Sequence, residues 1–216
     1  MSIYILANKI FGENRLKELV TIDKAAAEMS KDINYSGLEK YEEGVQLPVE
    51  TLVNLSLIIS ACASTAALAR HFYGTDEAFI KKMNEVAAGL NMSAHFDDIV
   101  GYSPNSVASA RALAILCREI VSKQPEILSV TSKSSCIFNK SVCANSNPLI
   151  GAGLLTETDG LKTGSTPHAG KCIVATAVRG GRRVIGVVLN SQENERRNPE
   201  IQALLEYGLA RVNESK

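Results

Sequence analysis

The chain has 216 residues, of which 45% are hydrophobic and 21% charged, enough to bury one substantial core within the usual size of a domain. Lys plus Arg and Asp plus Glu both number 23, so no net charge draws the chain toward nucleic acid or an anionic membrane. The histidines lie far apart and no CxxC pair occurs, so we expect no metal site and no cofactor.

The five cysteines are scattered along the chain. Cys117 and Cys172 lie inside apolar runs and are expected to be buried free thiols, because cysteine is among the most buried residue types. Cys136 and Cys143 are near enough in sequence to close a short loop, and the sequence alone leaves that question open.

Residues 3–11 have helical spacing, and Gly12 ends the pattern. This helix begins at the first residue with no capping residue before it. The opening has no basic stretch or small-residue cleavage site, so we expect no signal peptide here, and it is too short to span a bilayer. A β-like run at 19–22 follows, and Asp23 is expected to cap a short helix over 24–29.

Residues 30–46 are polar and are expected to form a loop with short strands. Pro48 is suited to the first position of a helix, and the apolar run 49–59 predicts a buried helix. Ser60 interrupts it, and a second helical pattern runs over 61–72 and ends at Gly74.

Thr75 is expected to cap the next helix, which has an apolar stripe formed by Phe79, Ile80, Met83, Val86, Ala87 and Leu90. A loop over 91–105 separates this helix from another amphipathic one over 109–121. The inward side chains predicted for that second helix are Leu113, Leu116, Cys117 and Ile120.

After Pro125 the pattern favours β structure, with strands expected at 128–131 and 135–138 and a loop at 145–153. The runs 171–178 and 183–189 are joined through Gly180-Gly181, a strong hairpin signal. The basic residues around it, from Arg179 to Arg183, therefore belong to a hairpin tip. A helix over 201–210 closes the chain, and the whole pattern predicts an α+β fold with helices packed on one antiparallel sheet.

Three short features carry chemistry, in the order Ser60-Ala61-Cys62, Lys162-Thr163-Gly164 and Arg197. Each is weak alone, because a Lys-Thr-Gly tripeptide is also a common turn entering a strand. The context is more specific: 159–166 runs into the apolar stretch 169–175, and the Gly-Gly hairpin and 184–189 follow.

That arrangement resembles the C-terminal part of the low-molecular-mass penicillin-binding proteins, serine-type D-Ala-D-Ala carboxypeptidases of the peptidase S11 type. The resemblance extends to 79–96, 109–111 and 204–208, and so covers nearly the whole chain. It implies a β-lactamase/transpeptidase-like fold and a single domain over residues 1–216 that lacks the family's leading strands and first catalytic motif.

The resemblance also implies roles for individual residues. Ser60 would relay a proton between a catalytic lysine and the leaving amine, and Lys162 would supply positive charge beside it. The substrate would be held by Cys62, Thr163, Gly164, Ser165, Thr166 and Arg197. Within that set Thr163 and Arg197 would bind the terminal carboxylate, and the Ser165 backbone N–H would be an oxyanion donor.

The chain departs from the family pattern in three places. The family's Ser-x-x-Lys nucleophile motif is absent from the sequence, and matching the first helix puts it before Met1, either because Met1 is an internal methionine or because the gene product is truncated. Cys62 stands where the family usually has asparagine, and a thiol is a weaker hydrogen-bonding group; the neighbouring Ser64 is a candidate to compensate. Ala112 stands where the family commonly has an aspartate near a helix start.

The expected function is therefore that of a D-Ala-D-Ala carboxypeptidase domain, of the type that acts on peptidoglycan stem peptides and binds β-lactams in the full-length protein. These 216 residues are expected to be inactive, because the Ser-x-x-Lys motif is absent. A non-catalytic peptidoglycan-binding or regulatory protein is the alternative. A class A β-lactamase is disfavoured because no Glu-x-x-Leu-Asn string lies between Cys62 and Lys162, and Cys62 is a weak candidate nucleophile. The resemblance places the protein outside the cytoplasm on the membrane's outer face, and missing strands would leave a sheet edge suited to dimerisation.

Overall fold

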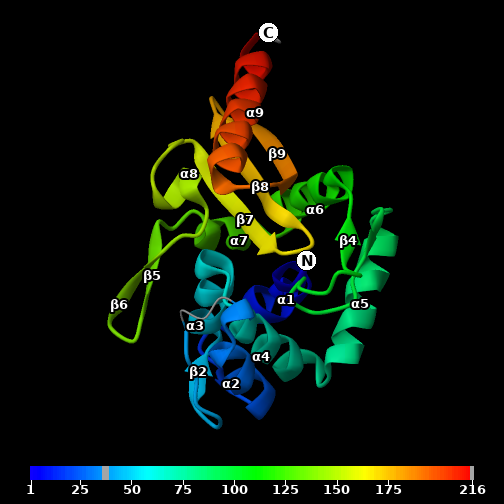
Figure 1. Ribbon diagram of the computed structural model, residues 1–216, viewed down its shortest axis with the longest axis vertical. Helices are drawn as coiled ribbons and strands as arrows, with labels where there is room; N and C mark the ends of the chain where they lie inside the picture. The colour runs from blue at the N-terminus through cyan, green and yellow to red at the C-terminus, as the bar shows by residue number, and fades with distance from the viewer. Residues whose placement is uncertain (36–38, 215–216) are drawn as a thin grey trace.

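The computed structural model describes residues 1–35 and 39–214. Residues 36–38, which belong to the polar stretch expected to be loop, lie outside the described part. Within it, helices and antiparallel strands are arranged as an α+β fold, as the sequence predicts. Figure 1 shows a sheet with helices on both faces above a largely helical part.

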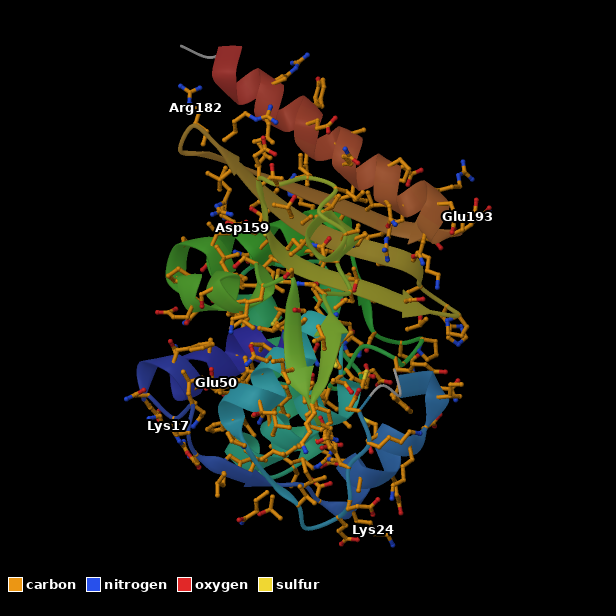
Figure 2. The ribbon with its side chains drawn as sticks, turned by 90° about the vertical axis from the view of Figure 1, so that its left-hand side faces the viewer. Lys17, Lys24, Glu50, Asp159, Arg182 and Glu193 are labelled. Carbon is orange, nitrogen blue, oxygen red and sulfur yellow. The ribbon has the colours of Figure 1, made fainter. Side chains whose placement is uncertain are left out.

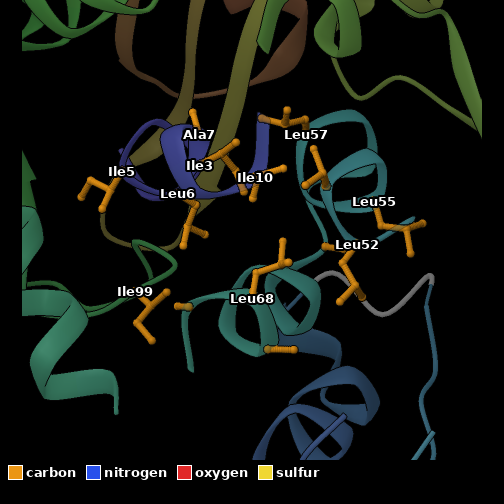
Figure 3. Packing of buried hydrophobic residues seen from close by; sticks show 14 of the residues in the cluster. Ile3, Ile5, Leu6, Ala7, Ile10, Leu52, Leu55, Leu57, Leu68 and Ile99 are labelled. Carbon is orange, nitrogen blue, oxygen red and sulfur yellow. The ribbon is translucent and has the colours of Figure 1, made fainter. Parts of the chain in front are cut away.

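The main hydrophobic core lies in the helical part. Helix α1 (Ser2–Ala7) continues as the π-helical turn η1 (Asn8–Gly12), and α3 (Val49–Asn54) continues in the same way as η3 (Leu55–Ile59). Helix α4 (Cys62–Tyr73) packs against both α1 and α3. Figure 3 shows leucine and isoleucine side chains from these helices converging, and Leu6, Leu52 and Leu68 are fully buried.

The segment between α1 and α3 is anchored by a small ladder and a capped helix. Strand β1 (Leu19–Thr21) pairs antiparallel with β2 (Gln46–Pro48). Helix α2 (Lys24–Lys31) is capped as predicted, since the Asp23 carboxylate accepts from the Ala26 N–H at 2.8 Å. The short 3-10 turn η2 (Ile33–Tyr35) follows α2. Pro48 is not the first helical residue but ends β2 and precedes α3 in extended backbone.

Helix α5 (Asp76–Gly89) is capped by Thr75, and α6 (Ala110–Lys123) by Ser109, each through a hydroxyl that accepts a backbone N–H. The stripe predicted on α5 buries Phe79, Met83 and Ala87. On α6 Leu113 is only partly buried. Between these helices the expected loop contains one short ladder, formed by β3 (Ala94–His95) and β4 (Val107–Ala108).

The strand predicted at 128–131 is wrong, because this segment belongs to helix α7 (Pro125–Thr131). Pro125 occupies the first turn, where its missing N–H costs nothing. The next strands, β5 (Ser135–Phe138) and β6 (Ser141–Ala144), form a hairpin. The expected loop after it contains the short helix α8 (Pro148–Gly151).

The largest sheet has the antiparallel order β7-β8-β9, with β7 (Thr158–Thr166), β8 (Gly170–Arg179) and β9 (Arg182–Ser191). The predicted Gly-Gly hairpin is confirmed: Gly180 and Gly181 have φ of 58° and 75°, in the left-handed region that this turn requires. Arg183 donates to both oxygens of Asp159 on β7, at 2.7 Å each, and Figure 2 shows Asp159 beside the sheet.

Helix α9 (Asn194–Glu214) covers one face of this sheet, and α6 and α7 cover the other. A second hydrophobic cluster fills the space under α9, formed by Leu149, Leu155, Ile173, Ala175, Ala177, Ile201, Leu205 and Leu209. The helix begins seven residues before the predicted start at 201, and it contains Pro199.

Candidate active site

Ser60 lies at a sharp junction between two helices. It follows η3 and precedes α4 with φ 67° and ψ 34°, the left-handed conformation. Residues with a Cβ rarely adopt this conformation, so the apolar packing on either side of the junction must maintain it. The junction places the Ser60 hydroxyl against β7, where it accepts a hydrogen bond from Lys162 Nζ at 2.7 Å.

Lys162 occupies the middle of β7, paired with Val174 of β8. Its ammonium donates to Ser60 Oγ and, at 2.9 Å, to the Thr163 carbonyl. Burial lowers the pKa of Lys162 to about 8, and the nearby Arg197 charge acts in the same direction. The side chain is therefore a cation at neutral pH that loses its proton more readily than an exposed lysine.

Cys62 begins α4, two residues beyond Ser60, and its thiol lies 3.8 Å from the Ser60 carbonyl oxygen. Burial raises the pKa of Cys62 to about 11, although the Lys162 charge opposes the shift. The thiol is therefore protonated at neutral pH and a poor nucleophile. Ser64 does not compensate for the missing amide, because its hydroxyl is fully buried and hydrogen-bonded to Tyr41.

The residues after Lys162 run along the edge of the sheet. Thr163 Oγ1 is 2.8 Å from Ser146 Oγ, and Ser165 Oγ accepts from Lys171 Nζ at 2.8 Å. Thr166 Oγ1 caps the turn into β8 by accepting from the Ala169 N–H. Gly164 and Ser165 are exposed, so their backbone is accessible from the cleft.

Arg197 reaches the same site from the first turn of α9. It is 5% exposed, and its guanidinium donates to Asn198 Oδ1 at 2.8 and 3.0 Å. Burial lowers its pKa. Among the residues that the structure describes, no carboxylate forms an ion pair with Arg197 or with Lys162.

These side chains line one cavity of about 500 Å³. Its wall contains every predicted site residue, namely Ser60, Cys62, Lys162, Thr163, Gly164, Ser165, Thr166 and Arg197. Its remaining lining includes Lys171, and none of the described lining residues is acidic. A cavity with three cations and no described anion favours a negatively charged ligand.

The structure adds residues that the sequence did not indicate. Ser146, which contacts Thr163, comes from the loop after β6 and carries no motif that marks it. Lys171 faces Ser165 across the β7–β8 ladder, and an explicit hairpin pairing of the two runs would have found it. Tyr102 also lines the cavity and packs against Tyr35 in a tilted arrangement, with ring centroids 4.8 Å apart and an interplanar angle of 44°.

Cys172 differs from its predicted environment. It is only partly buried, and it lines a neighbouring groove in which its sulfur accepts from the Asn190 N–H at 3.5 Å. Cys117 is buried as predicted, at 1% exposure. Within residues 1–35 and 39–214 no three His, Cys, Asp or Glu side chains cluster as metal ligands. In the same part of the chain, no helix is both long and apolar enough to cross a membrane.

Comparison with known proteins assigns residues 1–193 to the D-alanyl-D-alanine carboxypeptidase family, peptidase S11. The chain is 33% identical over 175 residues to the D-alanyl-D-alanine carboxypeptidase DacD of Escherichia coli, an alignment covering 80% of this chain and 45% of that protein. With DacC of the same organism the identity is 30% over 212 residues, or 96% and 53% of the two chains. The chain thus spans about half the length of these curated relatives.

Solved structures have the same fold. Penicillin-binding protein 5 of Haemophilus influenzae superposes with a TM-score of 0.88 at 28% identity, over 97% of this chain and 61% of that one. Penicillin-binding protein D2 of Listeria monocytogenes, in its ampicillin-bound form, superposes with a TM-score of 0.79 at 29% identity, over 96% of this chain and 83% of that one. The β-lactamase/transpeptidase-like fold expected from the motifs is therefore confirmed.

Proposed function

The chain belongs to the D-alanyl-D-alanine carboxypeptidase family, and from that premise we propose that its cleft binds the terminal D-Ala-D-Ala of peptidoglycan stem peptides for serine-type hydrolysis. The observation that carries the proposal is the pair of cations, Lys162 and Arg197, in one cavity without a described carboxylate partner. A peptide that ends in a free carboxylate supplies the missing charge.

The geometry supports a different role toward the substrate for each group in the cleft. Arg197 and the Thr163 hydroxyl would hold the carboxylate, and the exposed edge of β7 would offer the Ser165 N–H to the oxygen that becomes negative. The Ser60 hydroxyl, in contact with Lys162, would carry a proton toward the amine that leaves with the terminal D-Ala.

The sequence contains no Ser-x-x-Lys string, so peptide binding by these residues and formation of an acyl-enzyme have to be tested separately. The carboxypeptidase reaction requires a serine nucleophile with a neighbouring base. The second candidate function, a non-catalytic peptidoglycan-binding or regulatory protein, is favoured by that one observation. Both candidates share the carboxylate site, and they differ in whether a covalent intermediate forms.

Calorimetry or NMR titration with a D-Ala-D-Ala-terminated tripeptide tests the shared part. We expect saturable binding that falls by roughly ten- to hundred-fold in Arg197→Ala and in Lys162→Ala, since each removes a hydrogen-bonded charge. The matched ligand control is the same peptide with an amidated C-terminus, which should bind as weakly as the variants. Equal affinity for the free and amidated peptides would overturn the proposal.

Intact-mass spectrometry after incubation with benzylpenicillin separates the two candidates. A stable adduct identifies an acylating enzyme, and its mapped residue identifies the nucleophile. Peptide binding without any adduct identifies the non-catalytic protein. The β-lactam complex of the Listeria relative makes penicillin the appropriate probe.

We further propose that residues 1–216 form one transpeptidase-like domain that works outside the cytoplasm at the outer face of the cell membrane, where peptidoglycan is found. The free edge of β9, on the side of the sheet opposite the cleft strand β7, is the basis for a proposed dimer, since an unpaired strand can pair with a second copy. Sedimentation velocity over a concentration series would show a dimer if the edges pair, and a monomer throughout would contradict this.

A further inference from the structure

The hairpin β5–β6 holds two cysteines directly opposite each other. Its register pairs Cys136 with Cys143, and its closing pair is Phe138 with Ser141. Asn139 and Lys140 form the turn with φ of 47° and 63°, the left-handed pair of a two-residue type I′ turn. Because this turn fixes the register, thermal motion does not separate the two cysteines by a slip of the strands.

The spacing of this pair suits a disulfide. Counting outward from the closing pair, Cys136 and Cys143 occupy a hydrogen-bonded position, where facing Cα atoms are about 5.5 Å apart. Disulfides bridge Cα separations of about 4.4–6.8 Å. Both thiols are free in this structure, and they face the same side of the hairpin because the neighbouring pair, Ile137 and Val142, points outward at 74% exposure each.

The environment of the pair is accessible on one side and packed on the other. Both cysteines are partly buried and pack against the main core beside Phe138. The Phe138 ring meets the Tyr41 ring edge-on, with ring centroids 5.8 Å apart. Burial, followed by the neighbouring Cys143, raises the pKa of the Cys136 thiol. Reaction therefore requires a disulfide oxidant that can exchange with a small population of thiolate.

The hairpin leads directly into the candidate active site. The residue after β6, Asn145, is buried and donates to the carbonyls of Thr131 and Lys133, at 3.0 and 2.8 Å. Ser146 then donates its N–H to the Ile58 carbonyl, two residues before Ser60, and contacts the Thr163 hydroxyl. A covalent link across the hairpin thus constrains the segment that supports both Ser60 and Thr163.

We propose that Cys136 and Cys143 form an intrachain disulfide that closes the β5–β6 hairpin, which leads into the cleft through Ser146. One thiolate attacks the disulfide of an oxidant, such as oxidised glutathione or an oxidoreductase in its disulfide form, and releases one oxidant thiol. The second cysteine attacks the mixed disulfide, forms the Cys136–Cys143 bond and releases the other. Two electrons and two protons pass to the oxidant.

Tryptic digestion without reduction tests the bond. Trypsin cleaves after Lys133, Lys140 and Lys162, so Cys136 and Cys143 fall in the separate peptides 134–140 and 141–162. After treatment of the folded protein with oxidised glutathione, we expect these peptides to be recovered as one linked species that separates on reduction. Intact mass should fall by two hydrogens per chain.

Three variants control this result. Cys136→Ser and Cys143→Ser should each abolish the linked species, while Cys172→Ser, which removes a partly buried thiol on β8, should leave it unchanged. Circular dichroism of each variant shows that it is folded. Recovery of unlinked peptides with glutathione on one or both cysteines, or of a link to another cysteine, would overturn the proposal.

The consequence for stability is measured on the wild type and the double variant Cys136→Ser/Cys143→Ser. Oxidation should raise the melting temperature of the wild type and leave that of the double variant unchanged, because the link constrains only the former's unfolded chain. An equal response of the two proteins would show that the bond does not form in the folded state.

Discussion

The backbone of Ser60 is held in a conformation that favours glycine, with φ 67° and ψ 34°. Ser60→Gly and Ser60→Ala both delete the hydroxyl that contacts Lys162, but only alanine keeps the Cβ that clashes in this region. We expect Ser60→Gly to be more stable than Ser60→Ala by about 1 kcal/mol. Urea denaturation of the two variants measures the difference, and equal midpoints would show that the junction is not strained.

Lys162 predicts a pH dependence with opposite signs for binding and stability. Its pKa in the folded protein is about 8, well below the ordinary lysine value of 10.5, so the side chain is charged below about pH 8 and loses its charge as the pH rises through that value. Affinity for a D-Ala-D-Ala carboxylate should therefore decrease above that pH. Lys162→Arg, which stays charged throughout, should give a flat profile.

Stability should change in the other direction over the same range. Between about 8 and 10.5 the folded protein binds fewer protons at Lys162 than the unfolded chain does, so the free energy of unfolding rises with pH in that window. The comparison with Lys162→Met, measured by urea denaturation at each pH, isolates this contribution. A rise of the same size in the variant would assign it to other groups.

Site residues could be predicted from the sequence where they belong to a recognisable motif. The hydrogen bond between Lys162 and Ser60 joins residues that are 102 positions apart, and only the family resemblance connected them. Ser146 was not predictable, since its contact with Thr163 depends on how the β5–β6 hairpin packs against η3. The proposed role of Ser64 was wrong because sequence proximity to Cys62 does not reveal that its side chain points toward Tyr41.

At the scale of elements, Asp23 both caps a helix and forms an ion pair, whereas the uncharged Thr75 caps a helix but cannot form one. Both cap a helix, but the Asp23 carboxylate also accepts from Arg70 of α4 at 2.6 and 2.9 Å. We expect Asp23→Ala to cost about 2 kcal/mol and Thr75→Ala about 1 kcal/mol, since the first removes a cap and a bidentate ion pair. Thermal and urea unfolding of both variants test this order, and equal losses would mean that the ion pair contributes nothing.

Elements with a local chemical signal were predicted well. The caps at Asp23 and Thr75 and the Gly180-Gly181 hairpin depend on one or two residues whose preference is intrinsic. Ser109, expected as the first residue of a helix, instead caps α6. Helix α7 was mistaken for a strand because a short apolar run has the same pattern in either structure, and its burial against β7 decides between them. Helix α9 is longer than predicted, because it begins at Asn194 and contains Pro199.

At the scale of the whole molecule, the cleft lies where three parts meet. Ser60 and Cys62 come from the helical part, Lys162 and Thr163 from the sheet, and Arg197 from α9. The α+β class followed from the order of elements, whereas the cavity depends on the spacing between layers, which no local pattern encodes. The distance of α9 from the sheet therefore sets how far Arg197 reaches toward the cleft.

Gly186 on β9 is a test of that spacing. A Cβ there would lie 2.8 Å from Ile201 Cδ1 and 3.2 Å from Leu205 Cδ2. Both side chains are buried under α9, at 0% and 1% exposure, so they have little room to move aside. Gly186→Ala should cost about 1–3 kcal/mol through overpacking, and the displaced helix should weaken binding of the D-Ala-D-Ala peptide.

The matched control is Gly89→Ala at the end of α5, where an added Cβ meets nothing within 4 Å. Alanine there should raise stability by about 0.5–1 kcal/mol, because it restricts the unfolded chain and favours the helix, and should leave peptide affinity unchanged. Urea denaturation and peptide titration of both variants compare the two sites. If Gly186→Ala lost stability but kept full affinity, the position of α9 would not control the carboxylate site, and Arg197 would have to act through a local adjustment of its own side chain.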